Sequence, residues 1–298
     1  MTDTRSALIW FVALIGLVFA GDRMFAWALD QVLLRSQFRY SRLYRGGNAA
    51  DVLILGDSRG VHSFYAPAIE ELTGLRTLNL SYSSMSTRIA EAILLDYLDH
   101  NRAPRMVIVE VTSTITDGAI ASELRTYAGF SSRLSSLYAE GHPYGAFAGR
   151  AFHLFPLNSG FSLEALHYWH RSDQDWINRS PMPQALRHEP AGAWSLPRQD
   201  NLEALNRIVR VLRERGVEVR LVVAPYWPEP LNVAELARMV SVSVRHVEPD
   251  SRILNYAGAV RDPDDFADRV HLNERGSRQL LAIMNRDGVF AIHPPTAR

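Results

Sequence analysis

The chain has 298 residues, of which 47% are hydrophobic and 21% are charged, and its formal net charge is zero. This is the composition of a globular protein with room for one large domain, and the balanced charge gives no indication of a nucleic-acid partner. The absence of cysteine excludes disulfides, structural cysteine–zinc sites and thiol catalysis.

An apolar run, Ala7–Gly21, lies close to the N-terminus and ends before Asp22 and Arg23. The run is short for a helix that crosses the hydrocarbon core, which needs roughly 20 residues, but the apolar residues after Arg23 can extend it if Arg23 snorkels. We therefore predict a membrane-anchor helix over residues 1–34. Two alternatives stay open: a signal peptide cleaved after Ala20, which would release a secreted protein, and a buried core helix.

The rest of the chain is expected to lie outside the cytoplasm, on the periplasmic face of the membrane. Four arginines follow the run within residues 35–45, while only Arg5 precedes it. Because these arginines begin some distance past the run, they weaken this orientation without reversing it. Residues 35–50 are predicted to be a linker, and residues 51–298 a single large domain with an insertion.

The domain begins with the sequence DVLILGDSRG at residues 51–60. The apolar run Val52–Leu55, ended by Gly56, predicts a buried strand that stops in a tight turn. Ser58 then stands where open α/β sheets place their ligands, at the carboxyl end of a strand. The alternative is a loop whose serine only caps the next helix.

Strand and helix patterns alternate through the rest of the domain, which predicts a parallel sheet covered on both faces. The predicted strands after the first are 76–80, 106–111, 217–224 and 252–256, and the predicted helices are 66–73, 87–100, 202–215, 233–246 and 274–285.

A long segment, about 117–199, interrupts the alternation and is rich in aromatic residues, from Tyr127 to Trp194. A structureless loop of this length is implausible in a compact domain. We predict a mainly helical insertion, which either packs around a small core of its own or forms an aromatic wall for a substrate.

A second chemical motif, Asp268-x-x-His271, lies just before the last predicted helix. This spacing places the carboxylate beside the imidazole, where it can accept a hydrogen bond from Nδ1 and leave Nε2 free to take a proton from a serine. The motif follows the last predicted strand, so it is expected at the same sheet edge as Ser58.

These two motifs, GDSR at 56–59 and DRVHLN at 268–273, resemble those of the SGNH/GDSL hydrolase superfamily, and the strand–helix order agrees over residues 51–287. The resemblance implies a flavodoxin-like three-layer α/β/α sandwich with about five parallel strands. It also implies that Ser58 is the nucleophile, His271 the general base and Asp268 the partner that orients it, with no cofactor and no metal.

Two blocks depart from the pattern of that family. The loop after the second strand lacks the usual glycine, so we expect oxyanion donors from Ser81 or Ser83. The third block lacks the usual asparagine, and a hydroxyl of Thr112 or Ser113 could replace it in part. Such divergence is a feature of membrane-associated SGNH-like proteins linked to polysaccharide acylation, which this chain resembles.

Several alternatives remain at the level of single residues. GDSRG also fits the nucleophile elbow of α/β-hydrolases, but there the serine lies several strands into the domain. His62 could compete as the base. Three histidines of the insertion, His153, His167 and His170, could resemble a set of metal ligands, although no carboxylate at a suitable spacing supports a metal site. Substrate contacts are predicted for Arg59, Tyr226 and Trp227.

The sequence therefore predicts an esterase or O-acyltransferase that forms an acyl-serine intermediate. The substrate would be an ester of an envelope carbohydrate or lipid, and polysaccharide-assembly proteins would be partners. The alternative is a catalytically weak SGNH-like binding or scaffold protein in exopolysaccharide assembly.

Overall fold

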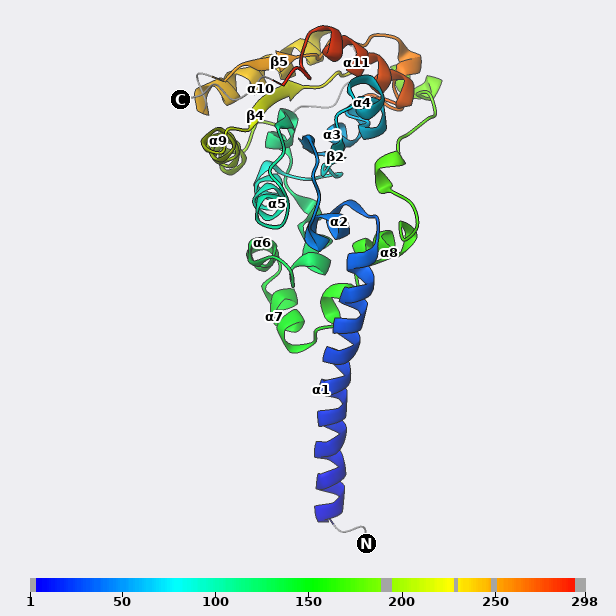
Figure 1. Ribbon diagram of the computed structural model, residues 1–298, viewed down its shortest axis with the longest axis vertical. Helices are drawn as coiled ribbons and strands as arrows, with labels where there is room; N and C mark the ends of the chain where they lie inside the picture. The colour runs from blue at the N-terminus through cyan, green and yellow to red at the C-terminus, as the bar shows by residue number, and fades with distance from the viewer. Residues whose placement is uncertain (1–3, 189–194, 228–229, 248–250, 293–298) are drawn as a thin grey trace. The chain divides into compact units, whose positions relative to one another are not determined.

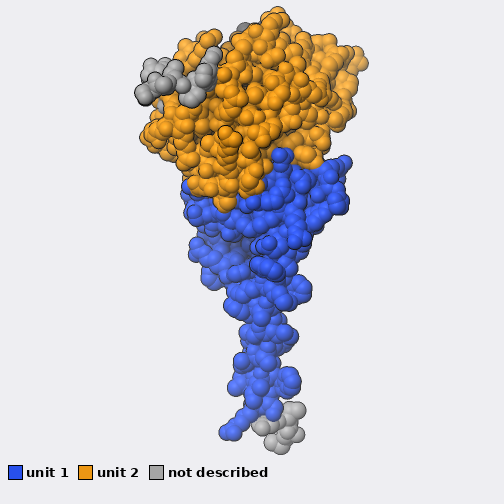
Figure 2. Space-filling model, viewed as in Figure 1, with its two compact units in different colours: residues 1–45, 121–171 blue, residues 46–120, 172–298 orange. Residues whose placement is uncertain are grey.

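The computed structural model describes residues 4–188, 195–227, 230–247 and 251–292, so Trp194 of the predicted insertion lies outside the described residues. The chain forms two compact units, coloured separately in Figure 2: unit 1 is Met1–Arg45 with Ala121–Arg171, and unit 2 is Gly46–Ile120 with Ser172–Arg298. This division differs from a single domain over 51–298, because residues 121–171 pack with the N-terminal helices.

Unit 2 contains a five-stranded sheet in which all neighbouring strands are parallel, in the order β2-β1-β3-β4-β5 (Figure 1). This is the flavodoxin-like strand order, so the predicted fold class is confirmed. Its strands are β1 (Val52–Leu55), β2 (Thr77–Asn79), β3 (Met106–Glu110), β4 (Glu218–Val223) and β5 (Ile253–Asn255).

The helices of unit 2 form two groups around this sheet. One group contains α5, α9 and α10, in which α9 packs against both of the others, and the second contains α3, α4 and α11, in which α11 packs against the other two. Their bounds are α3 (Ser58–Ser63), α4 (Ala66–Thr73), α5 (Thr87–His100), α9 (Gln199–Glu214), α10 (Pro230–Val247) and α11 (Glu274–Arg286). Short 3-10 helices lie in the loops: η1 (Val111–Ile115), η2 (Ala119–Ser122), η5 (Asp173–Asp175), η6 (Gln184–His188) and η7 (Pro263–Asp265).

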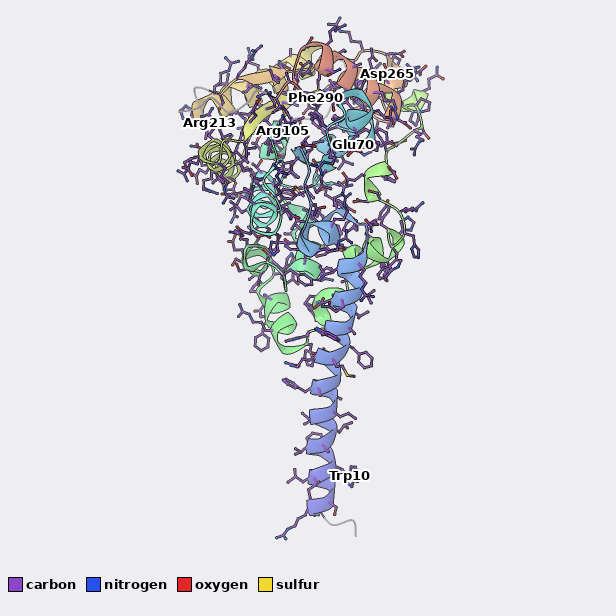
Figure 3. All side chains as sticks on the ribbon, in the orientation of Figure 1. Trp10, Glu70, Arg105, Arg213, Asp265 and Phe290 are labelled. Carbon is purple, nitrogen blue, oxygen red and sulfur yellow. The ribbon has the colours of Figure 1, made fainter. Side chains whose placement is uncertain are left out.

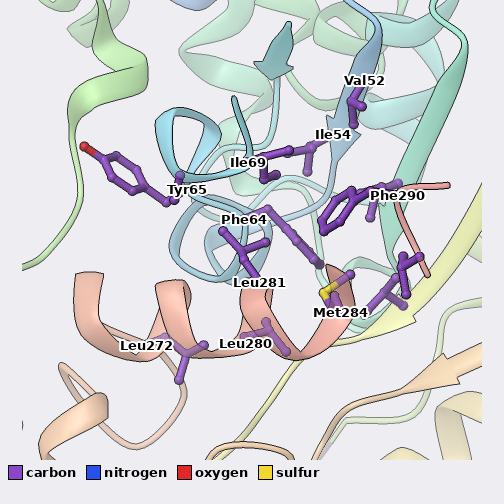
Figure 4. Packing of buried hydrophobic residues seen from close by; sticks show 14 of the residues in the cluster. Val52, Ile54, Phe64, Tyr65, Ile69, Leu272, Leu280, Leu281, Met284 and Phe290 are labelled. Carbon is purple, nitrogen blue, oxygen red and sulfur yellow. The ribbon is translucent and has the colours of Figure 1, made fainter. Parts of the chain in front are cut away.

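The buried cluster between β1 and the second helix group holds both chemical motifs in place (Figure 4). Phe64, just after α3, and Leu272, next to His271, are fully buried in it together with Leu280 and Leu281 of α11. Each fully buried side chain of this size contributes about 1.5–3 kcal/mol. The core therefore fixes the backbone on both sides of the motifs.

Unit 1 is mainly helical and has an aromatic core. Phe38 packs edge-on against Tyr40 and Phe161, and Tyr44 stacks on Tyr127. Tyr40 is fully buried, so residues 35–50, predicted as a linker, contain a packed helix, α2. The elements are α1 (Thr4–Arg35), α2 (Arg39–Arg45), η3 (Leu124–Tyr127), α6 (Ser132–Gly141), α7 (Pro143–Ala151), η4 (Phe155–Leu157) and α8 (Gly160–His167).

The helix α1 is long and apolar enough to cross a membrane, with a mean hydropathy of 1.8 over its most apolar window and none of that window buried. Trp10, labelled in Figure 3, projects from this part of α1 and is 75% exposed. By length and composition alone, such a helix fits either a membrane anchor or a signal sequence.

Candidate active site

Ser58 is held by a tight turn at the carboxyl end of β1. Asp57 caps α3: one of its carboxylate oxygens accepts from the backbone N–H of Arg59 at 2.9 Å, and the other accepts from the hydroxyl of Thr116 at 3.1 Å. A Cβ at Gly56 would lie 2.7 Å from the Cβ of Glu110, so only glycine allows the turn to pack this closely on β3. The cap is therefore Asp57, and Ser58 is the first helical residue.

The loop after β5 carries the second motif as a compact turn, not as a helix. Oδ1 of Asp268 accepts from the backbone N–H groups of Val270 and His271, each at 2.9 Å. The loop is closed by a bridge between Phe266 and Leu272, and Asn273 caps α11 by accepting from Gly276 at 3.1 Å. These bonds hold the Asp268 carboxylate beside the imidazole of His271.

The three side chains of the two motifs form a continuous hydrogen-bonded chain. Nε2 of His271 lies 2.7 Å from Oγ of Ser58, and Nδ1 lies 2.7 Å from Oδ2 of Asp268. Burial works to raise the pKa of Asp268, but the hydrogen bond and charge of His271, helped by the backbone N–H groups, outweigh it, and the pKa lies below its usual value. An ionised Asp268 can stabilise a protonated His271.

His62, the competing base, does not hold the position next to Ser58. Its ring instead packs against the ring of His271, with centroids 4.8 Å apart, and edge-on against Trp176 at 5.2 Å. This contact was not predicted, because Trp176 lies far away in the sequence. Among the described residues, no group of His, Asp or Glu is arranged to hold a metal ion.

Arg59 and Tyr226, predicted to contact substrate, are instead packed inside the protein. Arg59 is 4% exposed and Tyr226 is 1% exposed. The guanidinium lies over the Tyr226 ring, 3.1 Å from its centroid, and donates to the carbonyl of Pro225 at 2.9 Å. The positively charged side chain of Arg59 turns inward toward a buried carboxylate, Glu110, so these packing contacts do not favour the predicted substrate contact of Arg59 and Tyr226.

Trp227 lies closer to the motif loop. Its backbone N–H donates to the carbonyl of Arg269 at 3.1 Å, and its ring meets Phe266 edge-on at 5.6 Å. Because its side chain is only partly buried, Trp227 stays a candidate for substrate contact.

Glu110 is a functional-site neighbour that the sequence analysis missed. It is fully buried at the end of β3, where it accepts from the backbone N–H and hydroxyl of Thr112 and from the N–H of Ala224. Burial raises the pKa of Glu110 to about 7, against the opposing charge of Arg59, and burial also lowers the pKa of Arg59 to about 10. The sequence feature that could have indicated this residue is a glutamate at the end of an otherwise apolar strand.

Most of the predicted oxyanion donors have other hydrogen-bond partners. The backbone N–H of Ser81 donates to Asn79 at 2.9 Å, the Thr112 hydroxyl donates to Glu110, and the Ser113 hydroxyl donates to the Glu110 carbonyl at 2.9 Å. All three residues are 1% exposed or less. Ser81, Thr112 and Ser113 therefore do not offer these groups to a substrate, whereas Ser83 is exposed.

No protein-family model matches the chain, and no curated protein sequence matches it. Solved structures do match. A candidate acylhydrolase from Bacteroides fragilis is 9% identical, with a TM-score of 0.40, over 81% of this chain and 88% of that one. A mutant acetyl-xylooligosaccharide esterase from Geobacillus is 12% identical, with a TM-score of 0.40, over 82% of this chain and 95% of that one.

A carbohydrate esterase family 2 enzyme with a carbohydrate-binding domain, from Myceliophthora fergusii, is 9% identical, with a TM-score of 0.37, over 81% of this chain and 68% of that one. We draw no functional conclusion from likeness at this level. The strand order and the hydrogen-bonded Ser58, His271 and Asp268 are features of this chain itself, and both agree with the resemblance to SGNH/GDSL hydrolases.

Proposed function

We propose that the protein is a serine-dependent acyl-ester hydrolase or O-acyltransferase. The observation that supports this most directly is the hydrogen-bonded chain from Ser58 through His271 to Asp268. A hydroxyl, an imidazole and a carboxylate in this order are what an acyl transfer through serine requires.

In the first step, Oγ of Ser58 attacks the ester carbonyl carbon and gives its proton to Nε2 of His271. Asp268 holds the resulting imidazolium, which returns the proton to the departing alcohol as the acyl–oxygen bond breaks. In the second step, His271 takes a proton from water or from an acceptor hydroxyl, which attacks the acyl-serine. The proton then returns to Ser58, and the acid or the new ester leaves.

The developing oxyanion needs hydrogen-bond donors. Ser58 is the first residue of α3, so its N–H has no partner within that helix, and Ser83 is exposed on the neighbouring loop. We assign these two backbone N–H groups as donors. The anchor-like helix α1 favours a substrate at the cell envelope, and we propose an esterified carbohydrate or lipid there, with the domain on the periplasmic face and polysaccharide-assembly proteins as partners.

A second candidate, a weakly catalytic binding protein of exopolysaccharide assembly, is favoured by one observation. Thr112 and Ser113, in the block that usually supplies a side-chain donor, are committed to Glu110. Loss of one donor costs about 10²–10³ in kcat. Such a protein would bind the ester and turn it over slowly.

A chromogenic acetyl ester and an organophosphonate probe test the proposal together. Native protein should hydrolyse the ester and take up the probe at Ser58, and Ser58→Ala should abolish both. His271→Ala should abolish labelling while Ser58 is still present. If Ser58→Ala leaves ester turnover unchanged, the enzyme proposal fails. Labelling of native protein with turnover near background would favour the binding protein.

A further inference from the structure

The helix α7 is unusual because it is apolar yet buries none of its residues. Arg150 is its only charged residue, and Tyr144 and Phe147 are 90% and 72% exposed. A surface helix normally turns a charged face to water and an apolar stripe to the core. An apolar helix that leaves large aromatic side chains exposed indicates an interaction surface.

Neighbouring parts of unit 1 continue this surface. We use the name aromatic collar for six exposed residues of α1, α7 and the segment after α7, which are between 58% and 90% exposed: Met24, Phe25, Trp27, Tyr144, Phe147 and Phe152. The opposite face of this part of α1, with Asp22, Ala26 and Leu33, is buried. The collar therefore comes from two distant segments that unit 1 brings together.

Hydrogen bonds fix the position of α7 and the segment after it along the length of α1. The carboxylate of Asp22 accepts from the backbone N–H groups of His153 at 2.7 Å and Leu154 at 3.0 Å. Arg23 donates to the carbonyl of Ala151, the last residue of α7, at 3.4 Å. Asp22 is the first charged residue after the apolar run, so the end of α7, which lies alongside α1 in Figure 1, is tied to the place where the run ends.

The length of the run points to lipid as the partner of this surface. Residues 7–21 span roughly 22 Å as a helix, whereas the hydrocarbon core is roughly 30 Å thick. The missing length of about five residues reaches Met24 and Phe25, at the level of the collar. Asp22 can lie at this depth in the bilayer because its carboxylate accepts hydrogen bonds from backbone N–H groups of the protein itself.

We propose that the aromatic collar is a second membrane-contacting surface, which lies at the headgroup–acyl boundary of the bilayer that α1 crosses. Aromatic side chains are enriched at that boundary, and Arg23 and Arg150 suit anionic headgroups. A bilayer fits better than a second copy of the chain, because the collar is continuous with the exposed apolar face of α1. This inference rests on the proposed membrane anchoring.

Because the chain has no cysteine, single labelled cysteines can test this in the full-length protein. Phe147→Cys and, as a second collar variant, Tyr144→Cys carry an environment-sensitive fluorophore in phosphatidylcholine–phosphatidylglycerol vesicles. The quencher is a doxyl group placed near the headgroup or near the chain end of the lipid. Leu14→Cys reports the anchor, and Leu72→Cys, an exposed leucine of α4 in unit 2, is the matched control.

The collar positions should be quenched at least about twofold, more by the shallow than by the deep quencher, as expected for an interfacial depth of roughly 5–10 Å. Position 14 should respond most to the deep quencher, and position 72 to neither. Quenching at position 14 but not at 144 or 147 would contradict membrane contact by the collar and leave the anchor proposal standing. If position 14 is not quenched, or if mass spectrometry shows that it is absent from the mature protein, both the anchor and the collar proposals fail. A blue-shifted but unquenched probe at 147, with cross-links between copies, would assign the surface to a second copy instead.

Discussion

The two sides of Ser58 differ sharply in how completely they are prepared for acyl transfer. The proton-transfer side, made of Asp268 and His271, has both hydrogen bonds at 2.7 Å. On the oxyanion side, three of the four residues predicted to supply donors, Ser81, Thr112 and Ser113, have those polar groups bound elsewhere in the protein, which leaves the proposed backbone donors of Ser58 and Ser83. A nucleophile can be activated here more readily than its transition state can be stabilised.

The buried pair Arg59–Glu110 accounts for this difference in physical terms. Two ionisable groups inside a protein need hydrogen bonds to every available partner, and the glutamate takes both the N–H and the hydroxyl of Thr112. The Thr112 groups that were predicted as possible oxyanion donors therefore hydrogen-bond a buried carboxylate instead. The pair packs rigidly beneath the turn that carries Ser58, and this packing leaves fewer side-chain donors for the proposed oxyanion.

Asp268→Asn should break the proton-transfer side and have the largest effect. The amide cannot orient the imidazole as the carboxylate does or stabilise its protonated form, so kcat should fall by about 10³–10⁴. Ester hydrolysis checks this, with Asp264→Asn, another aspartate of the same region, as the matched control. A fall of less than tenfold would mean that His271 does not act as the base through Asp268.

Glu110→Gln should change how stability depends on pH. Burial raises the pKa of Glu110 to about 7, above the usual value of about 4.3 for an unfolded chain. The folded state therefore binds this proton more tightly, and its contribution to stability, full below that usual value, is lost as the pH rises through 7. The loss is on the order of 3–4 kcal/mol, and the glutamine variant should not show it.

Urea unfolding of both proteins in detergent, followed by tryptophan fluorescence from pH 4 to pH 8, measures this difference. Glu71→Gln, an exposed glutamate of α4, serves as the control. Equal pH profiles for native protein and the Glu110 variant would show that Glu110 is not the titrating group.

Much of the fold was predictable from local pattern. The bounds of β1, α4 and α5 agree residue by residue with the prediction, because glycines end β1 and α4 and the helical periodicity is strong. The packed helix α2 within residues 35–50 was not predicted, because it carries arginines at close spacing and the aromatic partners that bury it come from beyond residue 120. Sequence reasoning could not place two segments that far apart in one unit.

The candidate site divides in the same way. The meeting of Ser58, Asp268 and His271 could be predicted because each belongs to a short motif that follows a strand, and parallel strands bring the segments after them to one sheet edge. The inward turn of Arg59 could not be predicted, since its partner Glu110 is 51 residues away and an arginine is usually exposed. The contact between His62 and His271 depends on the same kind of long-range packing.

Thr112→Val should separate structure from catalysis on the oxyanion side. The hydroxyl donates to Glu110 and receives a hydrogen bond from Arg59 at 3.3 Å, so its loss should lower the free energy of unfolding by about 1–3 kcal/mol. Because the residue is 1% exposed, kcat should stay within about threefold, well short of the 10²–10³ of a lost oxyanion donor. Unfolding and ester hydrolysis on one preparation check both values. A large fall in kcat with unchanged stability would make Thr112 an oxyanion donor.

Ser83→Ala should have the smallest effect, and it tests whether the oxyanion side relies on backbone groups. The side chain is exposed, and substitutions at such positions usually change stability by less than about 0.5 kcal/mol. If only the N–H of Ser83 meets the substrate, alanine keeps that donor and kcat/KM should stay within about twofold. Ser84→Ala, at the neighbouring exposed serine, is the control for the loop. A fall of tenfold or more at position 83 alone would show that its hydroxyl stabilises the transition state, and the oxyanion side would then be better prepared than its buried groups suggest.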